Sequence, residues 1–132
     1  MHEDGEMNEP VIMHCAAGKE RTGLLIAIIL WTLGVDMDTI CGDYELTNLN
    51  LKYLNSELVL LAEKLSKKTG RNIDVNGVRS MLIAKPESLK LVLLRIQEIY
   101  GGPEGFLLSS GITTQEIDQL RKRLILPIRA KL

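Results

Sequence analysis

The most informative stretch of the chain is Val11-Ile12-Met13-His14-Cys15-Ala16-Ala17-Gly18-Lys19-Glu20-Arg21-Thr22-Gly23. Its first three residues are apolar, follow a proline and predict a short β-strand that leads into Cys15. The small residues 16–18 allow a tight loop whose backbone N–H groups point inward. From Thr22 onward, apolar residues recur at helical spacing, so the loop should open directly into a central, largely apolar helix.

Helical periodicity with standard start and stop signals continues through the rest of the chain. About six helices are expected in all. The end signals are Gly34, Asp36, Gly70, Pro86, Gly101, Gly102, the capping-box pair Thr113 and Glu116, and Pro127. Glycine suits the left-handed residue after a helix, aspartate and threonine suit the N-cap, and proline suits the first helical position.

One strand followed by helices predicts an α/β fold in which most of the sheet is missing. A lone strand leaves its backbone donors and acceptors without a ladder. We therefore expect the other strands to lie upstream of Met1 in a longer parent protein, or to come from a second chain. Residues 1–10 form a polar lead-in, and residues 11–132 form the C-terminal part of a single domain.

Composition indicates one soluble globular domain and names no partner. The 132 residues include 16 Lys plus Arg against 17 Asp plus Glu, and 45% are hydrophobic. A net charge of -1 gives no general reason to bind nucleic acid. The apolar stretch Leu24–Leu33 is about half the roughly 20 residues of a membrane span. No signal peptide is evident, and two cysteines without metal or redox spacing favour a cytoplasmic setting.

The residues around the turn have the chemistry of phosphoryl transfer. Arg21 can grip two phosphate oxygens through its planar guanidinium, and the loop amides with the helix N-terminus favour an anion. The same environment, with Lys19 and His14 nearby, is of the kind that lowers a cysteine pKa to roughly 3.5–7.5. Cys15 would then be an ionised nucleophile that forms a cysteinyl-phosphate.

Each of these residues also has an ordinary structural interpretation. A cysteine is often a small buried hydrophobe, and an arginine often makes a surface salt bridge. His14 is equally well a loop-supporting group or a plain hydrogen-bonded histidine. Glu20 could meet the helix dipole without any catalytic role. Cys41 is expected to pack between helices rather than act as a resolving thiol.

The segment His14-Cys15-x-x-Gly18-Lys19-x-Arg21-Thr22-Gly23 resembles the signature loop of the cysteine-dependent protein-tyrosine and dual-specificity phosphatases, above all the atypical microbial tyrosine and phosphoinositide phosphatases. The resemblance extends to the segments Asp43-Tyr44-x-Leu46-x-Asn48, Ala84-Lys85-Pro86-Glu87, Tyr100-Gly101 and Gly105-Phe106-Leu107. It covers nearly all of this chain, but only the C-terminal half of the family's domain.

The resemblance implies a role for each loop residue. Cys15 would be the nucleophile, Arg21 the phosphate clamp, and Thr22 a hydroxyl partner of the sulfur. His14 would orient the loop from behind. The phosphate-binding set would be Ala16, Ala17, Gly18, Lys19, Glu20 and Arg21. Neither a metal nor an organic cofactor is required, because cysteine, arginine and backbone amides supply the charge stabilisation.

Two positions leave the function open. The microbial subgroup usually has aspartate where this chain has Glu20, so its role as general acid is a hypothesis. Lys19 would favour polyanionic head groups such as phosphoinositides, but the sequence does not separate these from phosphoproteins as substrates. The expected activity is phosphate monoester hydrolysis. The alternative is a catalytically weak or inactive phosphate-binding or interaction fragment of such a phosphatase.

Overall fold

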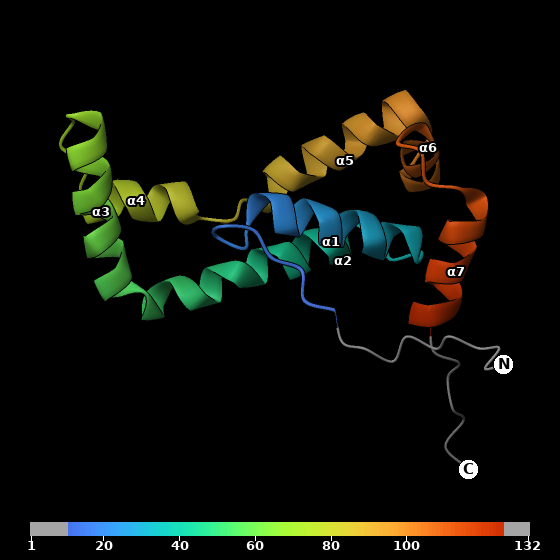
Figure 1. Cartoon of the computed structure of the whole chain (residues 1–132), viewed down its shortest axis with the longest axis horizontal. Coiled ribbons are helices and arrows are strands. Elements are labelled where there is room, and N and C mark those ends of the chain that lie inside the picture. The colour runs from blue at the N-terminus through green and yellow to red at the C-terminus, as the bar shows by residue number, and fades with distance from the viewer. Residues whose placement is uncertain (1–10, 126–132) are drawn as a thin grey trace, which may run out of the picture.

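The computed structural model describes residues 11–125, which form a chain of helices joined by short links (Figure 1). The helices are α1 (Glu20–Thr32), α2 (Met37–Glu45), the 3₁₀ helix η1 (Leu46–Tyr53), α3 (Asn55–Thr69), α4 (Val75–Leu82), α5 (Pro86–Tyr100), α6 (Pro103–Ser109) and α7 (Thr114–Leu124). None of the helices in this part of the chain is both long and apolar enough to cross a membrane.

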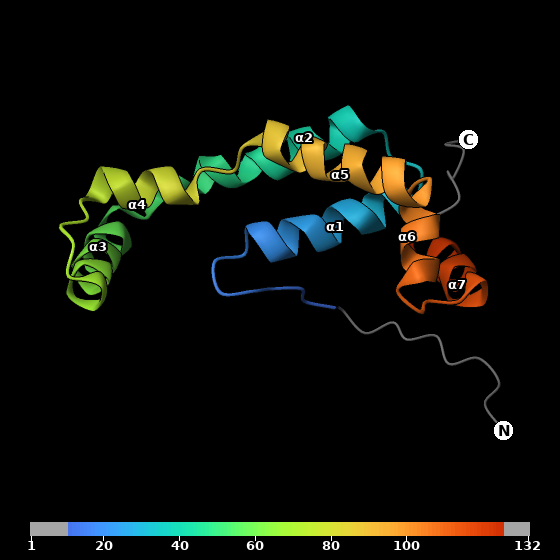
Figure 2. The same cartoon turned by 90° about the horizontal axis from the view of Figure 1, so that it is seen from above.

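Helix α1 contributes to the larger of two apolar clusters, as its composition predicts. It packs against α2 and α6, while α5 packs against α2 and α6. Ala27 and Ile28 of α1 meet Ile40 of α2 and Leu93 of α5 in this cluster. Burial of these side chains from water is the main driving force that holds the four helices together. Both views show α1 beside α2 and α5 (Figures 1 and 2).

Helices α3 and α4 form a hairpin with an apolar cluster of its own. Leu58, Ala62 and Val78 are buried between the two helices. The hairpin projects from the end of the molecule opposite α7 and is joined to the rest through η1 and residues 83–85 (Figures 1 and 2). These two connections are tied together, because the Asn48 side chain donates to the Ala84 carbonyl at 2.8 Å and accepts from the Ala84 N–H at 2.7 Å.

The predicted end signals that lie within residues 11–125 are confirmed, while Pro127 lies outside the described residues. The Asp36 carboxylate accepts a hydrogen bond from the Thr39 N–H at 2.9 Å, as an N-cap does. Thr113 and Glu116 form the reciprocal capping box, and Pro86 occupies the start of α5. The terminating glycines have the positive φ angles that L-residues disfavour. These glycines are Gly34, Gly70, Gly101 and Gly102.

Two features differ from the prediction. Helices α4 and α6 were not predicted individually, because they span 8 and 7 residues, each with an internal glycine, and show too few turns for a clear period. The predicted strand at residues 11–13 is not formed: residues 11–15 have no regular structure, and Val11 and Ile12 are 71% and 86% exposed. A strand needs a partner, and the described residues supply none. The predicted lead-in, residues 1–10, lies outside the described residues.

Candidate active site

Residues 16–19 form the turn that connects Cys15 to α1. Gly18 has a φ of 66°, so a side chain at this position would be strained. The Lys19 carbonyl accepts the Gly23 N–H at 2.6 Å, which is the first helical hydrogen bond at this end of α1. The backbone therefore reverses within four residues and delivers the N-terminus of α1 next to the cysteine.

Cys15 is half-buried, and its surroundings lower the pKa of the thiol to about 6. The largest cause is the Thr22 hydroxyl, followed by the Thr22 N–H; the amides of Ala17 and Gly18 add to it. Hydrogen bonds to the charged form favour it, so these donors hold the sulfur as a thiolate at neutral pH. The inward-pointing amides that the sequence predicts thus converge on the predicted nucleophile.

The Thr22 hydroxyl is buried and, among the described residues, has no partner that meets ordinary hydrogen-bond geometry. It nevertheless lies close enough to the sulfur of Cys15 to be the strongest influence on that thiol. A buried hydroxyl without an acceptor costs free energy. Ionisation of Cys15 gives this hydroxyl an anionic acceptor, so the two groups stabilise each other only in the thiolate state.

One open pocket of about 440 Å³ is lined by Cys15, Arg21, Thr22 and His14 together with apolar residues 12, 13 and 25. Arg21 lies in the first turn of α1, where it is exposed and lines the same pocket as Cys15. The His14 ring is also exposed, and its Nδ1 lies 3.3 Å from the Cys15 carbonyl oxygen. The structure therefore brings together the predicted nucleophile, clamp and hydroxyl partner, while His14 makes a local contact with the loop backbone.

Lys19 and Glu20 point elsewhere. The Lys19 side chain is buried, and its Nζ donates to the carbonyls of Met81 and Ile83 at the end of α4 and pairs with Glu20 Oε1 at 2.8 Å. This hydrogen bond from Lys19 is the largest cause of a lowered pKa of the Glu20 carboxyl. Glu20 is therefore held ionised, which is the wrong protonation state for a general acid. Neither residue lines the pocket of Cys15.

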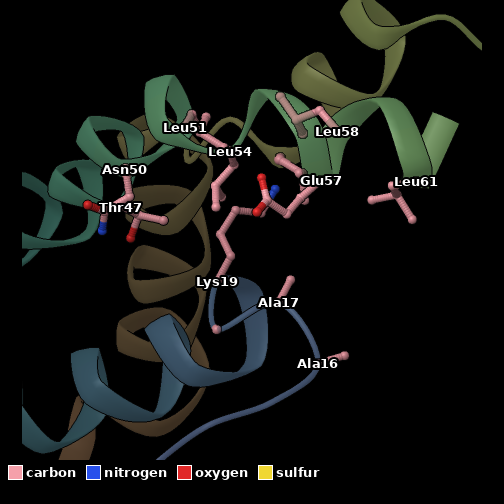
Figure 3. Close-up of a pocket in the computed structure, with 12 residues that line it drawn as sticks. Ala16, Ala17, Lys19, Thr47, Asn50, Leu51, Leu54, Glu57, Leu58 and Leu61 are labelled. Carbon is pink, nitrogen blue, oxygen red and sulfur yellow. The ribbon is translucent and has the colours of Figure 1, made fainter.

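A second hollow of about 530 Å³, shown in Figure 3, shares no lining residue with the pocket of Cys15. The loop residues 16–19 form one wall, and η1, α3 and the end of α4 form the rest. Its lining is mainly leucine, with a few polar groups. The leucines are Leu51, Leu54, Leu58, Leu61 and Leu82, and the polar residues are Thr47, Asn50 and Glu57. The turn thus lines this second hollow, while Cys15 and the first turn of α1 line the first.

Two supporting residues were named in the sequence only as parts of the resemblance, without a role. Tyr44 of α2 packs so closely on α1 that a Cβ on Gly23 would lie 2.5 Å from its ring. Burial, and secondarily the charge of Glu20, raises the pKa of Tyr44. Asn48 bridges the links on either side of the α3–α4 hairpin. The resemblance marked both residues, but the sequence does not show which residues they contact.

The second cysteine, Cys41, lies away from the pocket of Cys15. Cys41 is buried in the larger apolar cluster, where burial raises the pKa of its thiol, so the prediction that it is a packing residue is confirmed. Within residues 11–125, no group of three His, Cys, Asp or Glu side chains could hold a metal ion.

Comparison with known proteins agrees with this geometry. The family described as "Tyrosine phosphatase family" matches residues 2–126. Triple specificity protein phosphatase PtpB of Mycobacterium tuberculosis is 32% identical over 127 residues, which cover 88% of this chain and 44% of the relative. A tyrosine-protein phosphatase of Nostoc commune is 32% identical over 118 residues, which cover 86% of this chain and 38% of the relative. The chain spans less than half the length of these curated relatives.

Proposed function

Because the chain belongs to the tyrosine phosphatase family, we propose that it carries the nucleophile and phosphate loop of an enzyme that hydrolyses phosphate monoesters. The observation that carries this proposal is the Cys15 thiol, whose pKa of about 6 makes it a thiolate at neutral pH in the same pocket as Arg21. The curated relatives, both named as phosphatases, support the same activity.

In the proposed reaction, the Cys15 thiolate attacks phosphorus while the bond to the leaving oxygen breaks. The Arg21 guanidinium and the loop amides hold the non-bridging oxygens and stabilise the charge that develops on them. Water then attacks the cysteinyl-phosphate, which releases inorganic phosphate and returns Cys15 to the thiolate. The Thr22 hydroxyl stabilises the sulfur both as attacking and as leaving group.

The ionised state of Glu20 favours aryl esters as substrates. A phenol of pKa about 10 leaves as its anion far more readily than an alkyl alcohol, and so depends less on a protonated general acid. We therefore place phosphotyrosine in proteins first among the substrates. Phosphoserine, phosphothreonine and phosphoinositides, with alkyl leaving groups, come after it.

The proposed architecture extends beyond the described helices. Residues 11–13 would become a strand of an α/β phosphatase fold when further strands pair with them, either from an upstream segment or from another chain. The exposure of Val11 and Ile12 supports this arrangement, because β-rich apolar side chains remain on the surface until such strands cover them. In this view residues 11–132 are the C-terminal part of one domain.

The alternative function is phosphate binding with little or no turnover. The one observation in its favour is the ionised Glu20, which leaves the leaving group without an evident proton donor. The retention of Cys15 and the names of both curated relatives favour the enzyme instead.

The test is release of p-nitrophenol from p-nitrophenyl phosphate by the purified chain, without added metal, beside its Cys15→Ser variant. We expect turnover that vanadate inhibits and that the variant loses by a factor of at least about 10³. The Cys15→Ser variant should still bind vanadate or phosphate, whereas Arg21→Ala should lose both turnover and this binding. Full activity of Cys15→Ser would refute the mechanism, and phosphate binding by the folded chain without turnover would support the alternative.

A further inference from the structure

We propose that Lys19 is a positioning residue that fastens the phosphate loop to the end of α4, and that it does not contact the substrate. The effect on catalysis rests on the proposed function, whereas the attachment of the loop to α4 does not. Lys19 stands at the last position of the turn, immediately before α1, while its contacts on α4 lie more than 60 residues further along the chain.

The contacts of the Lys19 ammonium leave no N–H donor for a substrate. A lysine has three N–H donors. Here one reaches the Met81 carbonyl at 2.5 Å, one the Ile83 carbonyl at 3.3 Å, and one Glu20 Oε1 at 2.8 Å. All three donors are thus used within the protein. A substrate phosphate could recruit Lys19 only by displacing one of these partners.

Burial makes such a rearrangement unfavourable. The Lys19 residue is only 5% exposed. A buried ammonium is tolerated where fixed acceptors replace its water, and the carbonyls at the end of α4 are such acceptors because they carry the negative end of the helix dipole. Moving the ammonium out would leave these carbonyls without their partner. The lysine is therefore fixed by both its charge and its surroundings.

The position of Lys19 gives this contact a direct effect on the loop. Its own carbonyl starts α1 through the Gly23 N–H, and its neighbours Ala17 and Gly18 present their amides to Cys15. Fixing Lys19 against α4 therefore fixes the turn that directs those amides at the sulfur. The same contact holds the α3–α4 hairpin against the loop, across the leucine-lined hollow shown in Figure 3.

The first experiment measures amide hydrogen exchange by mass spectrometry in Lys19→Met, which keeps most of the aliphatic stem but removes the donors. Exchange in residues 79–85 and in the loop should accelerate roughly tenfold, the change expected when hydrogen bonds to a charged donor are lost. Lys68→Met, on the exposed last turn of α3, is the matched control and should not change those segments. Unchanged exchange in Lys19→Met would overturn the proposal, whether or not the chain is an active phosphatase.

A second measurement uses the unmutated ammonium and so remains decisive if Lys19→Met does not fold. The ¹⁵N signal of Lys19 Nζ should be protected from exchange with water and should not shift when vanadate saturates the chain. In Cys15→Ser it should also be unmoved by inositol 1,4,5-trisphosphate, which presents several phosphates. A shift of this signal with either ligand would assign Lys19 to substrate binding and refute the positioning role.

Kinetics then separate the two roles in the active enzyme. If Lys19 positions the loop, Lys19→Met lowers kcat/KM for p-nitrophenyl phosphate and for a phosphoinositide by the same factor, and raises the pKa at which Cys15 is alkylated by iodoacetamide. Lys19→Arg, which retains the charge and the donors, should recover part of both losses. A loss confined to the phosphoinositide would instead show that Lys19 recognises a second phosphate.

Discussion

The surroundings of Cys15 and Cys41 shift the pKa values of the two thiols in opposite directions. At Cys15, a hydroxyl and backbone amides stabilise the anion and lower the pKa to about 6. At Cys41, burial among apolar side chains is the largest effect and raises the pKa. Hydrogen bonds to a thiolate and loss of water around it act in opposite directions. Of these two thiols, only that of Cys15 is therefore largely ionised at neutral pH.

This difference predicts a pH profile for alkylation. The rate of iodoacetamide reaction at Cys15 should rise as the pH increases through about 6 and level off above about 7, because the thiolate fraction controls the rate. At pH 5 only about one tenth of the thiol is ionised. Mass spectrometry of the modified peptides measures each site separately. Cys41 serves as internal control and should stay largely unmodified; equal rates at both cysteines near pH 7 would contradict the assignment.

Thr22 should be the residue that most strongly controls this profile. In Thr22→Val the hydroxyl is lost while the shape is retained, so the pKa of Cys15 should move up toward the ordinary cysteine value and alkylation at pH 7 should slow by roughly tenfold. Thr22→Ser, which keeps the hydroxyl, should restore the profile. An unshifted alkylation pKa in Thr22→Val would mean that the amides alone hold the thiolate.

The sequence could predict that Cys15, Arg21 and Thr22 lie close together, because all three belong to one loop and the first turn of the following helix, where spacing determines proximity. It could not predict the partners of Lys19, whose backbone acceptors are the carbonyls of Met81 in α4 and of Ile83 just after it. Any residue has such carbonyls, so no side-chain pattern marks them. Lys19 and Glu20 consequently looked available to substrate and leaving group, although in the structure they pair with each other.

Two glycines in neighbouring helices differ in the space that is available for a side chain. A Cβ on Gly23 of α1 would lie 2.5 Å from the Tyr44 ring of α2, while a Cβ on Gly42 of α2 would meet nothing within 4 Å. Gly23→Ala should therefore destabilise the chain by about 1–3 kcal/mol, as overpacking does. Gly42→Ala should stabilise it by about 0.5–1 kcal/mol through helix propensity. Urea unfolding of both variants checks the sign of each change, and stabilisation by Gly23→Ala would show that Tyr44 can move aside.

The hydrogen bonds between Asn48 and Ala84 should contribute more to the free energy of unfolding than an exposed asparagine does. Ala84 is buried, so Asn48→Ala leaves both its N–H and its carbonyl without their partner, at a cost of about 1–3 kcal/mol. Exposed Asn72 beyond α3 provides the control, since Asn72→Ala should stay within about 0.5 kcal/mol. Denaturant unfolding measures both. Equal small effects would mean that water satisfies the Ala84 backbone once Asn48 is removed.

Elements with local end signals were predictable, and elements that depend on distant partners were not. Aspartate and threonine caps, terminal glycines and Pro86 act on their own helix, so α1, α2, α3, α5 and α7 could be placed from sequence. Helices α4 and α6 are too short to show a period. The strand at residues 11–13 has suitable side chains, but its formation depends on a ladder that the described residues do not contain.

The described part of the molecule is organised around two apolar clusters, which the chain connects through η1 and residues 83–85. The larger joins α1, α2, α5 and α6, and the smaller joins α3 and α4. The loop of Cys15 lies where the two parts approach each other, with Lys19 reaching across to the smaller one. The geometry of the site therefore depends on both clusters, although its chemistry comes from α1 and the preceding turn.

Regions with separate cores can unfold separately, which gives a prediction for the whole molecule. Leu58 and Leu93 are both almost fully buried, one in each cluster, and truncation of a buried leucine costs about 2–5 kcal/mol. Leu58→Ala should raise hydrogen exchange in α3 and α4 while α1, α2 and α5 stay protected. Leu93→Ala should raise exchange throughout the larger cluster and lower the overall unfolding midpoint. If Leu58→Ala instead raised exchange equally in every helix, the contacts of Lys19 and Asn48 would be strong enough to make the two clusters one cooperative unit.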